Sequence, residues 1–248
     1  MKLKERFGKK FLENAYKNTF RIACLEPKLI TMNFLRILLC LLLPIGIYAQ
    51  SDHEKYVEAK LISEVKWMQP GQPFWVALRL QMAPGWHTYW RNPGDAGLPT
   101  KIEWDLPDGF SAGEIRWPFP ERFANPPLVS YGYTDQVLLL VQLQPPASLQ
   151  PGTSVPLKAR ASWLVCKEAC FPGSAELILT LPVKATQPEL DPHSAKDFTE
   201  TRQKLPIDDS LWTVSAFQEQ NVLTLTVTPP KESKQQVGRL IFCPYEEM

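Results

Sequence analysis

The sequence lacks an excess of charge of either sign. Its 248 residues contain 27 lysines and arginines against 26 aspartates and glutamates, a formal net charge of +1. No basic stripe with interleaved aromatic residues is present either, so the charge pattern gives no basis for a nucleic-acid partner. Only three histidines are available as metal ligands. The chain also shows neither a Ser-His-Asp set nor the strand–helix setting of a phosphate-binding loop.

A hydrophobic run long enough to cross a membrane is missing as well. The apolar stretch Ile37–Tyr48 has about a dozen residues, which is short of the ~20 that a membrane span needs. It follows Met32 and Arg36 and ends at Ala49, which is the anatomy of a cleaved secretory signal. We therefore interpret residues 32–49 as a signal peptide and residues 1–31 as an upstream mis-start.

Helical periodicity is absent over long stretches after residue 50, whereas 24 prolines and eight tryptophans are present. This pattern predicts an all-β fold of short strands joined by irregular loops. The spacing of the strands favours an immunoglobulin-like β-sandwich over residues 50–185. The expected strands are Val57–Val65, Phe74–Leu80, an aromatic strand with a glycine-rich loop in Pro84–Pro99, Lys101–Asp105, Val137–Leu143, Val155–Leu164 and Ala175–Val183.

The composition changes after Val183. Residues 186–210 are interpreted as a linker, and two further strands are expected at Leu211–Phe217 and Val222–Thr228. Two or three strands cannot close a second sandwich. Residues 211–248 are therefore interpreted as a truncated second β segment.

Cysteine is scarce, with five residues in the chain. Cys24 and Cys40 would leave with the presequence, and the exported chain would keep Cys166, Cys170 and Cys243. A close cysteine pair in an oxidising compartment predicts a disulfide rather than a metal site. Cys243 is interpreted as a buried, inert thiol, with an intermolecular bond as the alternative.

The spacing of Cys166 and Cys170 constrains the local backbone. Residues four apart in a strand lie roughly 13 Å apart, whereas a disulfide tolerates Cα separations up to about 7 Å. A bond between the two therefore requires Lys167–Ala169 to turn, either as one turn of helix or as a tight hairpin. We expect a bent segment between two strands, ended by turn chemistry at Pro172-Gly173.

Three motifs together carry a family resemblance: Gly85–Gly97, Tyr131–Tyr133 and Trp163–Gly173. Over roughly residues 52–185 the sequence resembles the N-terminal periplasmic domain of the DsbD/ScsB thiol:disulfide interchange protein family, most closely its ScsB-like branch. The resemblance implies an immunoglobulin-like domain in the periplasm of a Gram-negative bacterium. It also implies no cofactor, and it carries the family's associations with cytochrome c biogenesis and copper tolerance.

The resemblance further implies a protein-disulfide reductase component. The domain would take electrons from a transmembrane thiol reductase domain or protein and pass them to oxidised periplasmic client proteins. Cys166 and Cys170 would be the catalytic pair, with Cys170 forming the mixed disulfide and Cys166 resolving it. An aromatic residue in the range Phe123–Tyr133 would shield the pair, and the candidates are Phe123, Tyr131 and Tyr133. DsbD itself has a wider gap between its cysteines than the three residues here.

Two other interpretations of the cysteine motif compete with exchange. The disulfide could be a structural staple, although so short a loop contributes only about 2 kcal/mol of stability. His87, with Cys166 and Cys170, would provide two sulfurs and a nitrogen for Cu or Zn. We expect instead no metal, and a structurally hydrogen-bonded imidazole. Arg91 and Asp95 are interpreted as architecture of the glycine-rich loop.

The alternative function belongs to another class, an exported β-sandwich that binds a sugar or a peptide. Its stacking platform would be built from aromatic side chains, and the disulfide would only brace a loop. Replacement of both cysteines by serine would leave such binding intact, whereas it would abolish thiol exchange. The platform residues would be Trp86, Tyr89, Trp90, Trp104 and Trp117.

Overall fold

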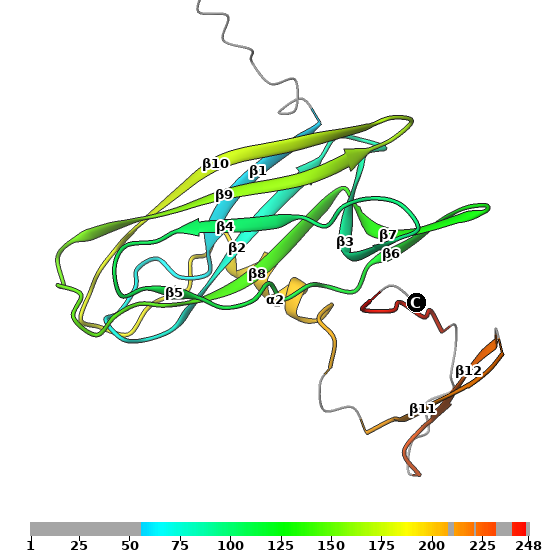
Figure 1. The fold of residues 1–248 in the computed structure, drawn as a ribbon. Helices are drawn as coiled ribbons and strands as arrows, with labels where there is room; N and C mark the ends of the chain where they lie inside the picture. Colours follow the sequence, from blue (N-terminus) through cyan, green and yellow to red (C-terminus); the bar gives the residue numbers. More distant parts are fainter. Residues whose placement is uncertain (1–55, 208–210, 221, 232–239, 247–248) are drawn as a thin grey trace, which may run out of the picture. The chain divides into compact units, whose positions relative to one another are not determined.

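The structure is a computed structural model, and it describes residues 56–207, 211–220, 222–231 and 240–246 (Figure 1). All of these residues belong to one compact unit, Ser51–Met248. The predicted signal peptide and mis-start lie outside the described residues. Among the described residues, no helix is both long and apolar enough to cross a membrane.

The first of two main sheets has four antiparallel strands in the order β1-β2-β8-β5. Its two central strands, β2 and β8, are nearly continuous runs of apolar residues, and Val76, Leu78 and Leu139 are almost fully buried. Such runs are typical of strands that are covered on both faces. The strand bounds are β1 Val57–Ser63, β2 Phe74–Met82, β5 Ser111–Ala112 and β8 Gln136–Gln144.

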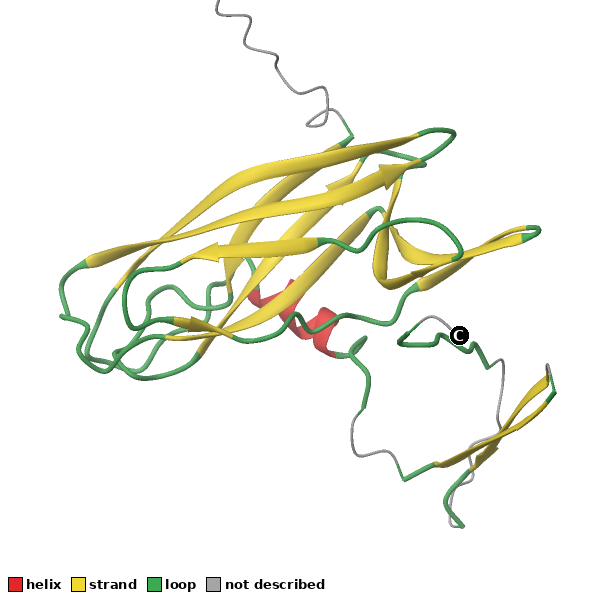
Figure 2. Ribbon diagram, viewed as in Figure 1, coloured by secondary structure: helices red, strands yellow, loops and turns green. Residues whose placement is uncertain are grey.

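The second sheet has the order β10-β9-β3-β7-β6, and β4 also pairs with β9. In β9, buried and exposed residues alternate from Ser154 onwards, because successive side chains of a strand point to opposite faces. The two sheets form separate layers (Figure 2). The strand bounds are β3 His87–Gly94, β4 Lys101–Asp105, β6 Glu121–Asn125, β7 Leu128–Thr134, β9 Ser154–Cys166 and β10 Cys170–Pro182.

The main hydrophobic core lies between these layers. It joins Leu80 and Leu139 of the first sheet to Trp90, Trp163 and Val165 of the second. Buried apolar area of this kind is the dominant favourable contribution to folding. The all-β class predicted from the strand pattern is confirmed.

Two features differ from the sequence-based expectation. The predicted linker contains a short helix, α2 (Ala195–Arg202), whose Phe198 is fully buried against Ala77, Leu138 and Leu140. One buried aromatic residue in eight gives almost no helical periodicity, so the helix left no signal in the sequence. The hairpin β6–β7 was also not predicted, and its tip carries Pro126-Pro127, residues that are typical of turns and loops.

The last two strands, β11 (Thr213–Glu219) and β12 (Val222–Thr228), pair as an antiparallel hairpin. Both strands were predicted within two residues of these bounds. Their apolar side chains, among them Phe217 and Val222, are largely exposed.

Candidate functional site

The two close cysteines form a disulfide at the tip of the β9–β10 hairpin. Cys166 ends β9, Cys170 begins β10, and their Cα atoms lie 4.1 Å apart as direct partners in the strand register. The three intervening residues close the turn, and the amide of Lys167 donates a hydrogen bond to the carbonyl of Ala169 at 3.1 Å. Of the two geometries that the spacing allowed, the structure adopts the tight hairpin.

The turn predicted at Pro172-Gly173 is wrong, because both residues continue β10. Proline is tolerated there because β10 is an edge strand, whose outward amides need no partner strand. Gly173 has a packing role: a Cβ atom at this position would lie 2.4 Å from Nε1 of Trp163. The glycine thus lets the indole of Trp163 lie against the backbone of the neighbouring strand.

The two sulfur-bearing residues differ in their exposure. Cys166 is 2% exposed, whereas Cys170 belongs to a run of exposed residues, 167–172, around the tip. A thiol from another protein must approach a disulfide sulfur directly, and access decides which sulfur is attacked. The geometry therefore presents Cys170 to a partner and keeps Cys166 behind it.

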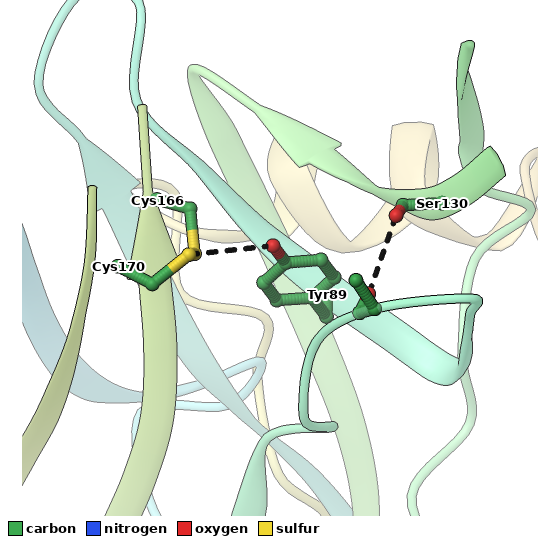
Figure 3. Close-up of a disulfide and its surroundings, with 5 residues drawn as sticks. Tyr89, Ser130, Cys166 and Cys170 are labelled. Carbon is green, nitrogen blue, oxygen red and sulfur yellow. Dashed lines mark hydrogen bonds between the residues drawn. A yellow bond between two sulfur atoms is a disulfide. The ribbon is translucent and has the colours of Figure 1, made fainter. Parts of the chain in front are cut away.

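Tyr89 contacts the disulfide from β3, the strand next to β9 in the second sheet (Figure 3). Its hydroxyl lies 3.8 Å from Sγ of Cys170, and the residue is only 4% exposed. A disulfide sulfur carries no hydrogen, so the phenol is the donor of this hydrogen bond. Burial raises the pKa of Tyr89 above its ordinary value of 10.0, and the phenol is therefore neutral at physiological pH.

The glycine-rich loop after β3 covers the ring of Tyr89. The loop is tied to β7: the amide of Val129 donates to a carboxylate oxygen of Asp95 at 2.7 Å, and the hydroxyl of Ser130 donates to the carbonyl of Ala96 at 3.2 Å. Figure 3 shows the second of these bonds beside the tyrosine. Asp95 is thus part of the loop architecture, as predicted, whereas the guanidinium of Arg91 lies 4.6 Å from the ring centroid of Tyr245.

Of the three candidate shielding residues, only Phe123 lies beside the cysteine region. The ring centroids of Phe123 and His87 lie 4.8 Å apart, and His87 is the strand partner of Cys166. Tyr131 and Tyr133 are buried in the main core. The hydroxyl of Tyr133 donates to the carbonyl of Pro118 at 2.8 Å, and burial raises the pKa of Tyr133. These two tyrosines are therefore core residues, and Phe123 is the remaining candidate.

Among the described residues, the imidazole of His87 makes aromatic contacts, and the hydrogen bond that the sequence suggested is not found there. Its ring centroid lies 5.3 Å from that of Tyr89 in an edge-on arrangement. Burial lowers the pKa of His87, which favours the neutral imidazole. Within the described residues, no group of three or more His, Cys, Asp or Glu side chains is arranged to hold a metal ion.

The aromatic platform of the alternative function is not assembled. Trp90 and Tyr89 are 2% and 4% exposed, and the indole of Trp90 faces the core. Trp86, Trp104 and Trp117 are half-buried and pack against the same core. The two buried rings have no free face on which a sugar could stack, and the three half-buried ones each pack against the core of the sandwich.

Cys243 lies in a segment that packs near β3 and β7. It is half-buried against the main core, and burial raises the pKa of its thiol, while the positive charge of Arg122 acts in the opposite direction. A raised pKa leaves little thiolate at neutral pH, and only the thiolate is nucleophilic. This placement agrees with the interpretation of Cys243 as an inert thiol.

The family model for the N-terminal domain of the thiol:disulfide interchange protein DsbD matches residues 54–182. The chain belongs to the DsbD N-terminal domain family. A solved structure with a similar fold is the N-terminal periplasmic domain of ScsB from Proteus mirabilis, with a TM-score of 0.51 and 21% identity, covering 69% of this chain and 64% of that chain. The DsbD family resemblance and the immunoglobulin-like sandwich predicted from the sequence are confirmed.

The N-terminal domain of DsbD from Neisseria meningitidis, solved in its reduced form, is 15% identical with a TM-score of 0.30, and the match covers 52% of this chain and 88% of that chain. No curated protein matches the chain at a significant level. The chain spans less than two thirds of the solved ScsB domain.

Sequence reasoning named the two cysteines that form this disulfide but missed Tyr89 as their neighbour. Tyr89 lies 81 residues from Cys170 in the chain, so no local pattern joins them. The available signal was the glycine-rich loop directly after the aromatic strand, since glycines at fixed places indicate close backbone approach. The glycines indicated that the loop packs closely against a side chain of β3. They did not indicate that this side chain, Tyr89, contacts Cys170.

Proposed function

We propose that this domain performs thiol:disulfide interchange in the periplasm, with Cys170 as the sulfur that partners attack and Cys166 as the resolving cysteine. The observation that carries the proposal is the difference in exposure at one hairpin tip. Cys166 is 2% exposed and Cys170 is exposed, in a chain of the DsbD N-terminal family. A purely structural staple has no need of this difference.

The domain is reduced in two exchange steps. The thiolate of a partner dithiol attacks Sγ of Cys170, the Cys166–Cys170 bond breaks, and Cys166 leaves as a thiolate that takes up a proton. The second thiol of the partner, after losing its proton, then attacks the partner's own sulfur in the mixed disulfide and releases Cys170. The partner loses two electrons and becomes a disulfide, and the domain gains them as two thiols.

The reduced domain then passes these electrons on. The thiolate of Cys170 attacks a disulfide of an oxidised client, and one client sulfur leaves as a thiolate. Cys166, 4.1 Å from Cys170 between Cα atoms in the disulfide form, attacks Sγ of Cys170 and releases the second client sulfur. The Cys166–Cys170 disulfide is restored, and the client is left with two thiols.

We take the direction of electron flow by analogy with the DsbD family, whose N-terminal domain model matches residues 54–182. We assign the electron donor to a transmembrane thiol reductase domain or protein, and the acceptors to oxidised periplasmic proteins. Each partner has to reach an exposed sulfur at a hairpin tip, which any protein with an accessible dithiol or disulfide can do. Thiol exchange of this kind needs neither a cofactor nor a metal.

The first test traps the mixed disulfide. Cys166→Ala and Cys170→Ala variants of the full chain, both reduced, are incubated with oxidised glutathione, and glutathionylated peptides are mapped by mass spectrometry. Cys166→Ala is expected to form the mixed disulfide at Cys170 at least about tenfold faster than Cys170→Ala forms it at Cys166, because access governs exchange. Cys243 is mapped in the same digest and serves as an internal reference for a half-buried thiol.

Faster trapping at Cys166 would reverse the two roles. The reduction potential of the pair tests the function itself, and a value above about −300 mV is expected for an exchange disulfide. A much lower value, or a disulfide that is reduced only when the domain unfolds, would identify a structural staple and would sink the proposal.

A further inference from the structure

The structure assigns a second role at the exchange site, to Tyr89. We propose that Tyr89 is a positioning residue whose hydroxyl donates a hydrogen bond to the Cys170 thiolate in the reduced domain, and that the Gly94–Gly97 loop exists to hold its ring in place. This inference rests on the proposed exchange function. It adds a residue that controls how acidic the attacking thiol is.

The hydroxyl of Tyr89 has a specific reason to remain near the sulfur. A buried phenol needs a hydrogen-bond partner, and within the described part of the chain that partner is Sγ of Cys170, 3.8 Å from the phenol oxygen. Tyr89 is 4% exposed, so water has little access to replace that partner. Reduction turns this sulfur from a weak acceptor into a thiolate, to which a hydrogen bond is stronger.

The loop over Tyr89 leaves the ring little freedom. A Cβ atom on Gly97 would lie 2.3 Å from two carbons of the Tyr89 ring, and Gly97 has a φ of +121°, which L side chains rarely adopt. Three hydrogen bonds tie the loop to Val129 and Ser130 of β7: the two described above and the bond from the amide of Asp95 to the carbonyl of Val129 at 2.9 Å. The loop backbone therefore leaves no room for a side chain between Gly97 and the ring of Tyr89.

The effect on acidity follows from the sign of the charge. A donor that hydrogen-bonds the thiolate favours the charged form and lowers the pKa of Cys170. The phenol is suited to this because burial keeps it protonated. The neighbouring elements carry other charged or titratable groups, among them Lys167 and Glu168 in the hairpin turn, His87 and Arg91 on β3, Asp95 in the loop, and Glu121 and Arg122 on β6. Removing only the hydroxyl of Tyr89 leaves these groups in place.

The test is the pH profile of Cys170 alkylation by iodoacetamide in the reduced full chain, carried in a Cys166→Ala background and mapped by peptide mass spectrometry. Tyr89→Phe is expected to raise the pKa of Cys170 by about one unit or more, because one hydrogen bond to a charged group is lost. Gly97→Ala keeps the hydroxyl but displaces the ring, and is expected to raise the pKa in the same direction.

Tyr133→Phe is the matched control. It also removes one buried hydroxyl, whose partner is the carbonyl of Pro118 and not a sulfur. It is expected to lower the melting temperature and to leave the pKa of Cys170 unchanged. An unchanged pKa in Tyr89→Phe, or an equal shift in Tyr133→Phe, would overturn the role of Tyr89. If Tyr89→Phe does not fold, Gly97→Ala decides by the same criterion.

Failure of this inference is distinguishable from failure of the exchange function. A wild-type disulfide that dithiothreitol reduces readily in the folded domain, together with an unchanged pKa in Tyr89→Phe, removes only the role of the tyrosine. A wild-type disulfide that cannot be reduced without unfolding overturns both proposals.

Discussion

Two neighbouring residues of β3 are almost equally buried, for different reasons. Trp90 is 2% exposed and Tyr89 is 4% exposed. Trp90 points into the core between the sheets and packs with residues of both layers. Tyr89 points to the opposite face, as alternation in a strand requires, and is covered there by the glycine-rich loop and contacts Cys170.

The comparison separates burial for stability from burial for a site. The core face of β3 carries Thr88, Trp90 and Asn92, whereas the opposite face carries His87 and Tyr89 beside the cysteines. A sandwich sheet is normally solvated on its outer face. Here an extra loop covers part of that face, and the covered side chains are those that approach the disulfide.

The largest effect is expected on the core face. Trp90→Ala should lower the free energy of unfolding by about 3–5 kcal/mol, because a large cavity opens in the core. The pH profile of Cys170 alkylation should not change, because Trp90 faces away from the sulfur. Urea denaturation monitored by circular dichroism measures the free energy of unfolding. The pH profile of Cys170 alkylation is measured in Trp90→Phe, which keeps a ring in the core and is expected to fold better. A shifted Cys170 profile in Trp90→Phe would contradict the separation of the two faces.

A smaller loss is expected for Asn92→Ala. Asn92 is 4% exposed; its amide donates to the carbonyl of Pro244 at 2.9 Å, and its side-chain oxygen accepts from the amide of Gly94 at 3.0 Å. Truncation leaves these groups without their partner, which should cost about 1–3 kcal/mol in urea denaturation. Asn125→Ala, at an exposed position of β6, is the control and should stay within about 0.5 kcal/mol. Equal effects would argue that the contact with Pro244 contributes nothing.

On the outer face, Phe123→Ala should change reactivity more than stability. Phe123 is half-buried beside His87, and its removal should raise the second-order rate of reduction by dithiothreitol several-fold, because access to the disulfide increases. The loss of stability should be about 1 kcal/mol. Phe119→Ala removes a ring that is 62% exposed and has no ring contact with His87 among the described residues, and it should leave the rate unchanged. An unchanged rate in Phe123→Ala would remove the shielding role.

The smallest effect is a pH dependence from His87. Burial lowers the pKa of His87 in the folded domain below the unfolded value of 6.5, so the unfolded chain binds more protons between those two values. The free energy of unfolding should therefore rise with pH across this interval and fall as the pH drops below about 6.5. Denaturation between pH 5.5 and pH 7.5 should show a flatter dependence in His87→Gln. His193→Gln, at an exposed site, should retain the wild-type slope.

Most of the strands could be predicted because their signals are local. Alternating side chains and turn residues placed β4 at its observed bounds, Lys101–Asp105, and β12 likewise at Val222–Thr228. The same patterns could not distinguish a strand whose apolar side chains are buried in the core from one whose apolar side chains remain exposed. Phe217 of β11 is 65% exposed, although its strand reads much like those of the sandwich. Alternation of polar and apolar residues indicates an extended strand. Whether the apolar side chains of that strand are buried depends on which other elements pack against them.

Helix α2 and the role of Pro172-Gly173 show the limit of local reasoning. The helix is stabilised by one phenylalanine, Phe198, that packs across the paired strands β2 and β8, and by a pair of hydrogen bonds between Arg202 and Glu64, 138 residues apart. The sequence pattern predicted a turn at Gly173. In the structure a glycine is needed there because the indole of Trp163 on the adjacent strand leaves no room for a Cβ atom. In each case the deciding contact is with a residue that is distant in the chain or on another strand.

The sequence by itself determined that Cys166 and Cys170 must sit on a bend if they bond, because covalent geometry permits nothing else at that spacing. It also determined the strand pattern and the motifs by which the DsbD family is recognised. Only the tertiary structure decided that Cys170 is the exposed partner and that Tyr89 reaches its sulfur. Exposure and contact are properties of packed neighbours, and packing brings together residues that no sequence spacing relates.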